Sequence, residues 1–344
     1  MNFESVTIKD IAKELGISAS SVSRALNDSY EISERTKKLV IECARKLNYQ
    51  PNSMARSLKQ GNSKAIGVVV PLVDNRFFSQ VIDGIESIAH SKGYNVIFTQ
   101  SRESSKLEMF NVDHLTSHSI DGLLMSLSTE TTDVGYLKKL HAKGLPIVFF
   151  DRICDEINTH KVIADNFMGA LEGTTQLINA GYRKIAHITG SINVSITKER
   201  LNGYKLALER NNIAVNEQHI KYCLYGGKDR KEIENILIEL LYGENRPDAI
   251  FTASDMITTT TFSLLHQLKF SIPKDIAILG FSNVQEADIL NPSLSTIYQP
   301  GLEMGKKAAE MLIGLIETKR HIINFETVTL PTQVHIRNSS LRAE

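Results

Sequence analysis

The chain of 344 residues is 42% apolar, and its 39 Lys and Arg side chains balance its 39 Asp and Glu side chains. A chain of this length can bury more than one hydrophobic core, so two or three domains are expected. Residues 1–62 carry ten basic and seven acidic side chains, which is too small a bias to indicate nucleic-acid binding by itself.

Cysteine usage and the lack of long apolar runs bear on the compartment. Cys43, Cys154 and Cys223 are odd in number and lack the paired spacing of a disulfide framework or a metal site, which favours a reducing cytoplasm. No apolar run approaches the ~20 residues of a membrane span, and the first residues lack the apolar centre of a signal peptide. We expect a cytoplasmic protein with no membrane partner, no metal and no cofactor.

Residues 5–50 are expected to form three short helices. Each has a start signal: Thr7 with Asp10 three residues later, then Ser18, then Ser33 ahead of a periodic run. No strand pattern interrupts them. The chain therefore begins with a small all-helical domain.

The first two of these helices fit a helix-turn-helix. In TIKDIAKELGISASSVSRALN, Gly16 stands where the chain must turn, and glycine takes the left-handed conformation that ends a helix. Ser18 then caps a second helix that begins near Ala19. Helical spacing turns four apolar side chains inward: Ile11, Leu15, Val22 and Leu26. The alternative is a small helical bundle with a polar surface and no DNA partner.

The second helix presents an outward face suited to DNA. Ala19, Ser20 and Arg24 share this face, and Arg24 is its only long side chain able to read a base. Short hydroxyl side chains that suit phosphate contact surround it: Ser18, Ser21 and Ser23.

From Ala65 onward the pattern changes to short strand-like runs, each followed by an amphipathic helical stretch, which is typical of parallel βαβ units. The expected strands, whose nearly continuous apolar character suits burial on both faces, are 65–72, 94–100, 122–127, 147–150, 185–189, 249–253 and 276–281. One compact lobe cannot hold this many alternating strand and helix units. We therefore expect two doubly wound lobes with a cleft between them.

Polar side chains follow several of these strands where each strand ends: Asp74, Asn75, Ser126, Asp151, Arg152, Ser254, Asp255, Ser282 and Asn283. Ligands of open α/β sheets bind beyond the carboxyl ends of the strands, so these side chains point to one crevice. Any one of them is more often a turn former or a helix cap, but their coincidence favours a ligand cleft. Phe77 and Phe78 either stack on a sugar or base face or anchor the core at a helix start.

The stretches VTIKDIAKELGISASSVSRALN and ISERTKKLVIECARKLNYQPNSMARSLK resemble the head and hinge of the LacI/GalR family of ligand-responsive transcription regulators. The resemblance continues through DNRFFSQVIDGIE, FFDR, NAGYRKIAHITG, ERLNGYKLAL, ILGFSN and NPSLSTIYQPGLEMGKKA, and so covers nearly the whole chain. It implies an α/β fold class: a helix-turn-helix head joined to a two-lobed, doubly wound body like that of periplasmic binding proteins.

For the head, the resemblance implies that Ala19, Ser20 and Arg24 read bases in the major groove. The residues it brings near the DNA backbone are Thr7, Ser18, Ser21, Ser23 and Asn27. Within a hinge at 51–62, the pattern NSMARSLKQ is too short for a stable isolated helix, and Leu58 matches the family's apolar wedge in the minor groove. The alternative is a plain linker with Leu58 packed on the body.

For residues 63–344, the resemblance implies two lobes, one of about 63–162 and 293–323 and the other of about 163–292 and 324–338. Arg200 matches the arginine that clamps ligand oxygens, and its alternative is a surface salt bridge with Glu199 or a neighbour. Many relatives carry an aspartate where this chain has Ser282, which puts a simple hexose in doubt. A sugar acid, a phosphorylated sugar or an oligosaccharide fragment fits.

The resulting prediction is a sequence-specific DNA-binding repressor whose operator affinity is set by a small, carbohydrate-derived effector. Its other partners are a nearly palindromic operator and a second copy of the chain, forming a dimer without a tetramer tail. An enzyme is the main alternative, but the usual phosphate-loop, dinucleotide and zinc motifs do not occur, and Gly226-Gly227-Lys228 has the wrong spacing. A periplasmic sugar-binding protein is opposed by the helical head.

Overall fold

The computed structural model describes residues 6–49, 62–318 and 324–342. The chain forms two compact units, Met1–Ser63 and Lys64–Glu344, which we call the head and the body. Among the residues it describes, no helix is long and apolar enough to cross a membrane.

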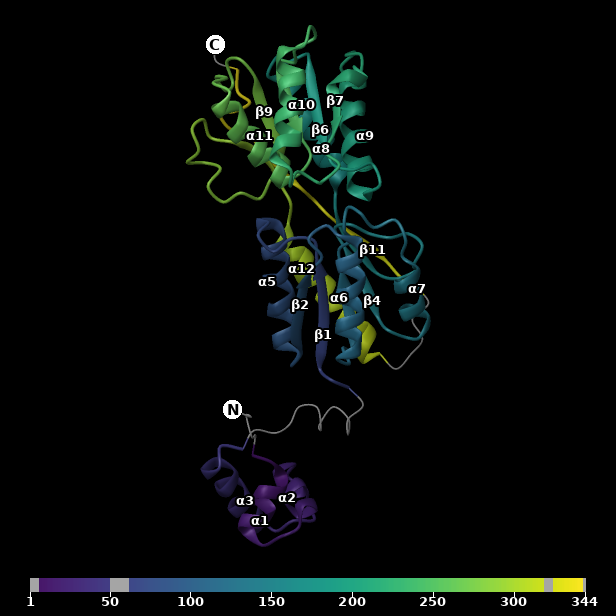
Figure 1. The fold of residues 1–344 in the computed structure, drawn as a ribbon, viewed down its shortest axis with the longest axis vertical. Helices are drawn as coiled ribbons and strands as arrows, with labels where there is room; N and C mark the ends of the chain where they lie inside the picture. Colours follow the sequence, from purple (N-terminus) through teal and green to yellow (C-terminus); the bar gives the residue numbers. More distant parts are fainter. Residues whose placement is uncertain (1–5, 50–61, 319–323, 343–344) are drawn as a thin grey trace. The chain divides into compact units, whose positions relative to one another are not determined.

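The head consists of three helices, α1 (Ile8–Leu15), α2 (Ala19–Leu26) and α3 (Glu34–Lys46) (Figure 1). Gly16 ends α1 with φ 64° and ψ 27°, the left-handed conformation expected of it. Ser18 caps α2, because its side-chain oxygen accepts a hydrogen bond from the Ser21 N–H at 3.0 Å. Ser33 caps α3 in the same way. The expected start signals are thus the caps that begin the second and third helices.

A small core holds the head together. Ile11, Val22 and Val40, one from each helix, are fully buried. Leu15 and Leu26 pack against this core and are partly buried. The helical spacing expected from the sequence therefore places the apolar stripe on the inner face of the helix pair.

The first lobe of the body is built on a six-stranded sheet whose strand order is β11-β5-β4-β3-β1-β2. All its strand pairs are parallel. The strands are β1 (Ala65–Val70), β2 (Asn95–Gln100), β3 (Gly122–Met125), β4 (Ile147–Phe150), β5 (Lys161–Ala164) and β11 (Thr327–Leu330). The helices of this lobe are α5 (Arg76–Ser91), α6 (Ser105–Ser117), α7 (Gly135–Ala142) and α12 (Gly301–Glu317).

The second lobe repeats this plan with the strand order β12-β10-β9-β8-β6-β7, in which only β12 is antiparallel to its neighbour. The strands are β6 (Ile185–Thr189), β7 (Ile220–Tyr222), β8 (Ala249–Thr252), β9 (Ala277–Phe281), β10 (Ser295–Tyr298) and β12 (Gln333–His335). The helices are α8 (Asn166–Asn179), α9 (Ser195–Arg210), the short η1 (Glu217–His219), α10 (Arg230–Tyr242) and α11 (Asp255–Gln267).

The chain passes between the lobes three times, after β5, after β10 and after β11 (Figure 1). Each passage lies a few residues later than the boundaries near 162, 292 and 323 expected from the sequence. The reason is that β5, β10 and β11 are strands of four residues with polar side chains, which carry a weak strand signal. All seven strands expected from the sequence are present.

One expectation about the strands is wrong. β2 is not buried on both faces, because it lies at the free edge of the first sheet, and its Ile97 and Phe98 are 40% and 49% exposed. Helices α5 and α12 pack with their backbones nearly touching. A Cβ at Gly84 would lie 2.2 Å from the Leu302 carbonyl oxygen, and a Cβ at Gly305 would lie 2.0 Å from that of Val81. Only glycine allows this contact.

Candidate functional site

The outer face of α2 carries the three side chains predicted to read bases. Ala19, Ser20 and Arg24 are all exposed. The Arg24 guanidinium is not isolated, because its Nη1 lies 2.8 Å from a carboxylate oxygen of Glu31. Beside Glu31, the ring of Tyr30 is 93% exposed. Sequence reasoning missed both residues, since a loop of mixed polarity after a helix carries no distinctive pattern.

The side chains expected near the DNA backbone also serve the head's own structure. Thr7 donates from its backbone N–H and its hydroxyl to Asp10, and these bonds lower the pKa of Asp10. Ser18 shares a hydrogen bond with the hydroxyl of Ser21. The Asn27 amide donates to the Ser23 carbonyl at 2.7 Å. Leu58 lies outside the described residues.

In the body, three buried side-chain oxygens at the carboxyl ends of parallel strands have no hydrogen-bond partner among the described residues. They are Ser126 Oγ after β3, Asp151 Oδ1 after β4 and Thr189 Oγ1 at the end of β6. Buried polar groups in native proteins are almost always paired, so such oxygens mark a place where a ligand or water completes the pairing. Ser126 and Asp151 were predicted as ligand residues; Thr189 was not.

Asp151 and Arg200 bring charge to these strand ends. Asp151 has φ 58°, a left-handed conformation that is rare for a residue other than glycine and common at functional sites. Burial raises the pKa of Asp151, and the positive charges of Arg152 and Arg200 offset part of that rise. Because Asp151 follows β4 of the first lobe and Arg200 belongs to α9 of the second, this attraction acts between the lobes.

Arg200 is held by hydrogen bonds inside the second lobe. Its Nε and Nη2 donate to the Asn166 side-chain oxygen at 2.8 and 2.6 Å, and its Nη1 donates to the Ala253 carbonyl. The guanidinium stacks on Phe281 at 3.7 Å, and burial lowers its pKa to about 10. The alternative of a surface salt bridge is wrong, because the residue is only 2% exposed.

Ser282 and Asp255, predicted separately, form a pair. The Ser282 hydroxyl donates to the Asp255 carboxylate, and the Ser282 oxygen accepts from the Val284 N–H. Burial raises the pKa of Asp255, while the bond from Ser282 counteracts that rise. The carboxylate that the sequence lacks at position 282 is therefore supplied by the neighbouring strand end.

Five other predicted ligand residues have structural contacts that explain them. Asn75 and Ser254 cap α5 and α11. Phe77 and Phe78 are 4% and 2% exposed and belong to the core of the first lobe. Their burial favours the prediction that they anchor the core over the prediction that they stack on a ligand. The Asn283 amide bonds Gln80 and the backbone of Gln299. Asp74 is exposed and has no described hydrogen bond.

One residue that sequence reasoning missed lies beside a strand that it also missed. Asn166, which orients Arg200, follows the short strand β5. Arg152, one of the polar side chains expected at the crevice, pairs with Glu103 at 2.7 Å. Its charge, together with hydrogen bonds from Thr129, outweighs the effect of burial and lowers the pKa of Glu103. Recognising β5 as a strand would have pointed to Asn166.

The motif Gly226-Gly227-Lys228 has a position that the sequence did not suggest. Lys228 Nζ donates to the backbone carbonyl of Arg102. Since Lys228 belongs to the second lobe and Arg102 to the first, this bond links the lobes near the strand ends. The motif therefore contacts protein backbone.

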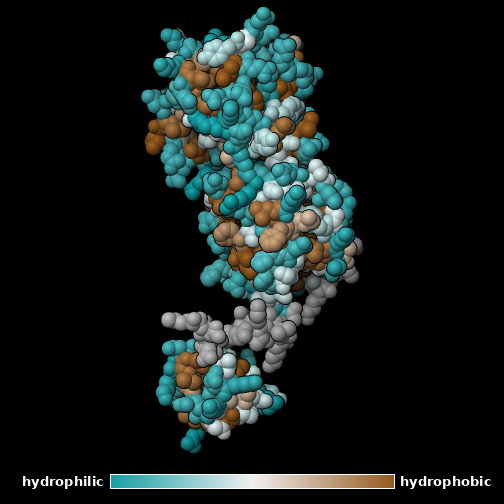
Figure 2. All heavy atoms as spheres, viewed as in Figure 1, coloured by the Kyte–Doolittle hydropathy of each residue, from teal (hydrophilic) through white to brown (hydrophobic). Residues whose placement is uncertain are grey.

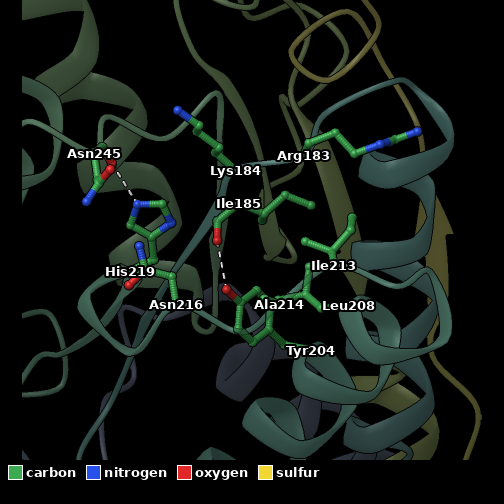
Figure 3. Close-up of a pocket in the computed structure, with 10 residues that line it drawn as sticks. All are labelled: Arg183, Lys184, Ile185, Tyr204, Leu208, Ile213, Ala214, Asn216, His219 and Asn245. Carbon is green, nitrogen blue, oxygen red and sulfur yellow. Dashed lines mark hydrogen bonds between the residues drawn. The ribbon is translucent and has the colours of Figure 1, made fainter.

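A separate hollow of about 110 Å³ lies at the amino end of β6, opposite Thr189 (Figure 3). Two of its polar side chains are used within the fold: the His219 Nε2 donates to the Asn245 carbonyl, and the Tyr204 hydroxyl donates to that of Ile185 (Figure 3). Arg183 points away from the other labelled side chains (Figure 3). No predicted ligand residue lines this hollow.

Comparison with known proteins gives the family and the fold. Residues 7–52 match the profile of bacterial regulatory proteins of the lacI family, and residues 174–340 match the periplasmic binding protein-like domain. The ribose operon repressor of Haemophilus influenzae is 34% identical over 338 residues, which cover 97% of this chain and 98% of that protein. The chain belongs to the lacI family. This lacI-family regulator is also 32% identical over 315 residues to the transcriptional repressor PurR of Vibrio vulnificus, covering 92% and 93% of the two chains.

Solved structures confirm the fold. The regulator CelR in complex with cellobiose matches with a TM-score of 0.71 and 25% identity, over 97% of this chain and 99% of that one. The lac repressor dimer bound to operator and the anti-inducer ONPF matches with a TM-score of 0.83 and 22% identity, over 98% and 100%. The lacI-family regulator is therefore a ligand-responsive, DNA-binding transcription regulator, and its named relatives are repressors, not enzymes.

Proposed function

We propose that this regulator represses transcription from a nearly palindromic operator and that its operator affinity is set by a sugar or sugar derivative bound between the lobes of its body. The observation that carries the proposal is the group of buried oxygens of Ser126, Asp151 and Thr189 that lack a well-aligned hydrogen bond to a described residue, together with the attraction between Asp151 and Arg200. Sugar hydroxyls both donate and accept hydrogen bonds, so they complement a carboxylate and a guanidinium at once.

A neutral sugar or glycoside fits these charges better than a phosphorylated one. Asp151 is buried and Asp255 is half-buried at the strand ends, and the positive charge of Arg200 is already attracted by Asp151. A phosphate group would bring two further negative charges next to them. A purine base is disfavoured, because Phe77 and Phe78 are buried in the core and offer no open aromatic face. The sugar-related names of two relatives, a ribose operon repressor and a regulator bound to cellobiose, favour the same class.

On DNA, we assign base reading to Arg24, with Ala19 and Ser20 contributing small contacts such as a thymine methyl. The polar side chains assigned to phosphate contact are Thr7, Ser18, Ser21, Ser23 and Asn27. Two identical heads related by a two-fold axis read the same bases on opposite strands, which requires a nearly palindromic operator. We assign to Leu58 the role of minor-groove wedge at the operator centre.

We also propose that the regulator is a homodimer that uses the free edge of the first sheet. This edge carries four exposed apolar side chains of β2 and α6: Ile97, Phe98, Met109 and Phe110. Figure 2 shows that apolar side chains reach the surface of the body. A free strand edge with apolar side chains favours pairing with another chain, and a second copy satisfies the two-fold operator as well. Three buried free cysteines suit the reducing cytoplasm that the proposal requires.

The test is a thermal-shift screen of the full-length protein with D-ribose, cellobiose, ribose 5-phosphate and adenine, followed by operator release measured by fluorescence anisotropy. A ligand at 100 times its Kd stabilises by about 2.7 kcal/mol, which raises the Tm of a domain of this size by about 5–10 °C. We expect such a shift with a neutral sugar, and a change in operator affinity with the same compound. Stabilisation by adenine alone would overturn the assignment of the effector class.

A further inference from the structure

The ion pair between Arg24 and Glu31 involves the Nη1 nitrogen of the Arg24 guanidinium. Nη1 of Arg24 lies 2.8 Å from a carboxylate oxygen of Glu31, in an ion pair that lacks the alignment of a hydrogen bond. Nε and Nη2 make no hydrogen bond to any described residue. Both side chains are accessible, at 58% and 44% exposure, so the free edge of the guanidinium is open to a DNA base.

Glu31 stands in a loop that the head holds in place. The Ser29 N–H donates to the Arg24 carbonyl at 3.0 Å, and the Ile32 N–H donates to the Ser29 carbonyl at 3.3 Å. Lys37, whose side chain is only 11% exposed, pairs with Asp28 at 2.6 Å. Because the loop is tied to both α2 and α3, the backbone of Glu31 is held beside Arg24.

We propose that Glu31 is a positioning residue for DNA sequence recognition, which holds Nη1 of Arg24 so that the edge formed by Nε and Nη2 faces the base pair. Two parallel N–H groups on one guanidinium edge match the O6 and N7 acceptors of guanine. Ordering this long side chain before binding reduces the entropy lost when DNA binds. The proposal rests on the assignment of Arg24 as the base reader.

A second effect of Glu31 acts in the same direction. Its negative charge repels phosphates of any sequence and so weakens non-specific binding. Positioning strengthens binding only where Arg24 meets guanine. Glu31 therefore raises the ratio of specific to non-specific affinity, and the two effects separate experimentally because only positioning depends on Arg24.

The experiment compares Glu31→Ala with the matched variant Glu34→Ala in the full-length protein. Glu34 is 80% exposed and pairs with Lys37, not with Arg24, so its removal takes away the same charge from the same part of the head. Consensus sites are selected from a random DNA pool, and the Kd is then measured for the consensus and for DNA changed at the base pair that Arg24→Ala no longer discriminates.

For Glu31→Ala we expect discrimination at that one base pair to fall about 2- to 5-fold, the range for an exposed ion pair. Discrimination elsewhere should be unchanged, as should all discrimination in Glu34→Ala. In an Arg24→Ala background, adding Glu31→Ala should have no further effect on discrimination. Glu31→Gln, which keeps the length of the side chain but removes its charge, should behave like Glu31→Ala, because the contact is an ion pair.

Four results would overturn the proposal. Equal tightening on every sequence would mean that Glu31 acts only through its charge, and sharper discrimination in Glu31→Ala would mean that it competes with DNA for Arg24. If Arg24→Ala selects the wild-type consensus, the assignment of Arg24 as base reader is wrong and the role of Glu31 is refuted with it. Loss of discrimination in Arg24→Ala but not in Glu31→Ala refutes the role of Glu31 alone.

Discussion

Replacing Arg200 with alanine tests the effector site and the second lobe together. A guanidinium has five N–H groups, of which three donate within the lobe, to Asn166 and to the Ala253 carbonyl. One N–H on each of Nη1 and Nη2 remains for a ligand. Arg200→Ala removes both of these donors and also leaves two buried acceptors without their partner.

The size of the effect follows from these contacts. Each orphaned acceptor costs about 1–3 kcal/mol, and loss of the stacking on Phe281 costs about 2 kcal/mol. The variant also no longer buries the positive charge of the guanidinium. The lowered pKa of Arg200, about 10, indicates that burying this charge costs about 3 kcal/mol, which partly offsets the losses. We expect the free energy of unfolding to fall by about 1–5 kcal/mol, and each kcal/mol lowers the Tm by about 2–4 °C.

Effector affinity should fall by at least about 100-fold, because each lost bond to a charged donor contributes about 1.5–3 kcal/mol. The assays are thermal denaturation, calorimetric titration with the sugar that gives the largest thermal shift, and anisotropy with operator DNA, whose binding should persist. Arg210→Ala, at the exposed end of α9, is the control and should change the stability by less than about 0.5 kcal/mol. Wild-type effector affinity in Arg200→Ala would refute the reasoning.

Three further predictions concern other parts of the chain. Burial raises the pKa of Asp151 above its value in the unfolded chain, so the ionised carboxylate destabilises the fold at pH values above the folded pKa, and this destabilisation vanishes below about pH 3.9. Asp151→Asn should therefore raise the Tm at pH 7 and lose that advantage near pH 4. A lower Tm of Asp151→Asn at pH 7 would contradict this prediction. Ser18→Ala removes the cap of α2 and should weaken operator binding by about 1 kcal/mol without changing sugar binding; equal loss of both would argue against it. Phe98→Glu should yield monomers in sedimentation, whereas Ile289→Glu, at a side chain 81% exposed in the second lobe, should leave the dimer intact; a dimeric Phe98→Glu would exclude the β2 edge as the interface.

Local sequence signals were sufficient to predict the three helices of the head and the order of the helices and strands in the body. Gly16, Ser18 and Ser33 act within one turn of the chain, so their roles as helix end and helix caps follow from neighbouring residues alone. The apolar runs of the central strands were equally readable, because a strand buried on both faces has few polar residues. The polar residues that follow these strands also indicated the end of each sheet at which we place the effector.

Only the tertiary structure decided which polar side chains at those ends are available to a ligand. Asn283 is fully hydrogen-bonded by Gln80 and Gln299, and Ser282 is paired with Asp255, through contacts between residues far apart in the sequence. Asn166 became visible only when β5, a strand of four residues, paired with its neighbours. Pairing of this kind depends on which elements pack together, and a sequence pattern records the preference of each element but not its partner.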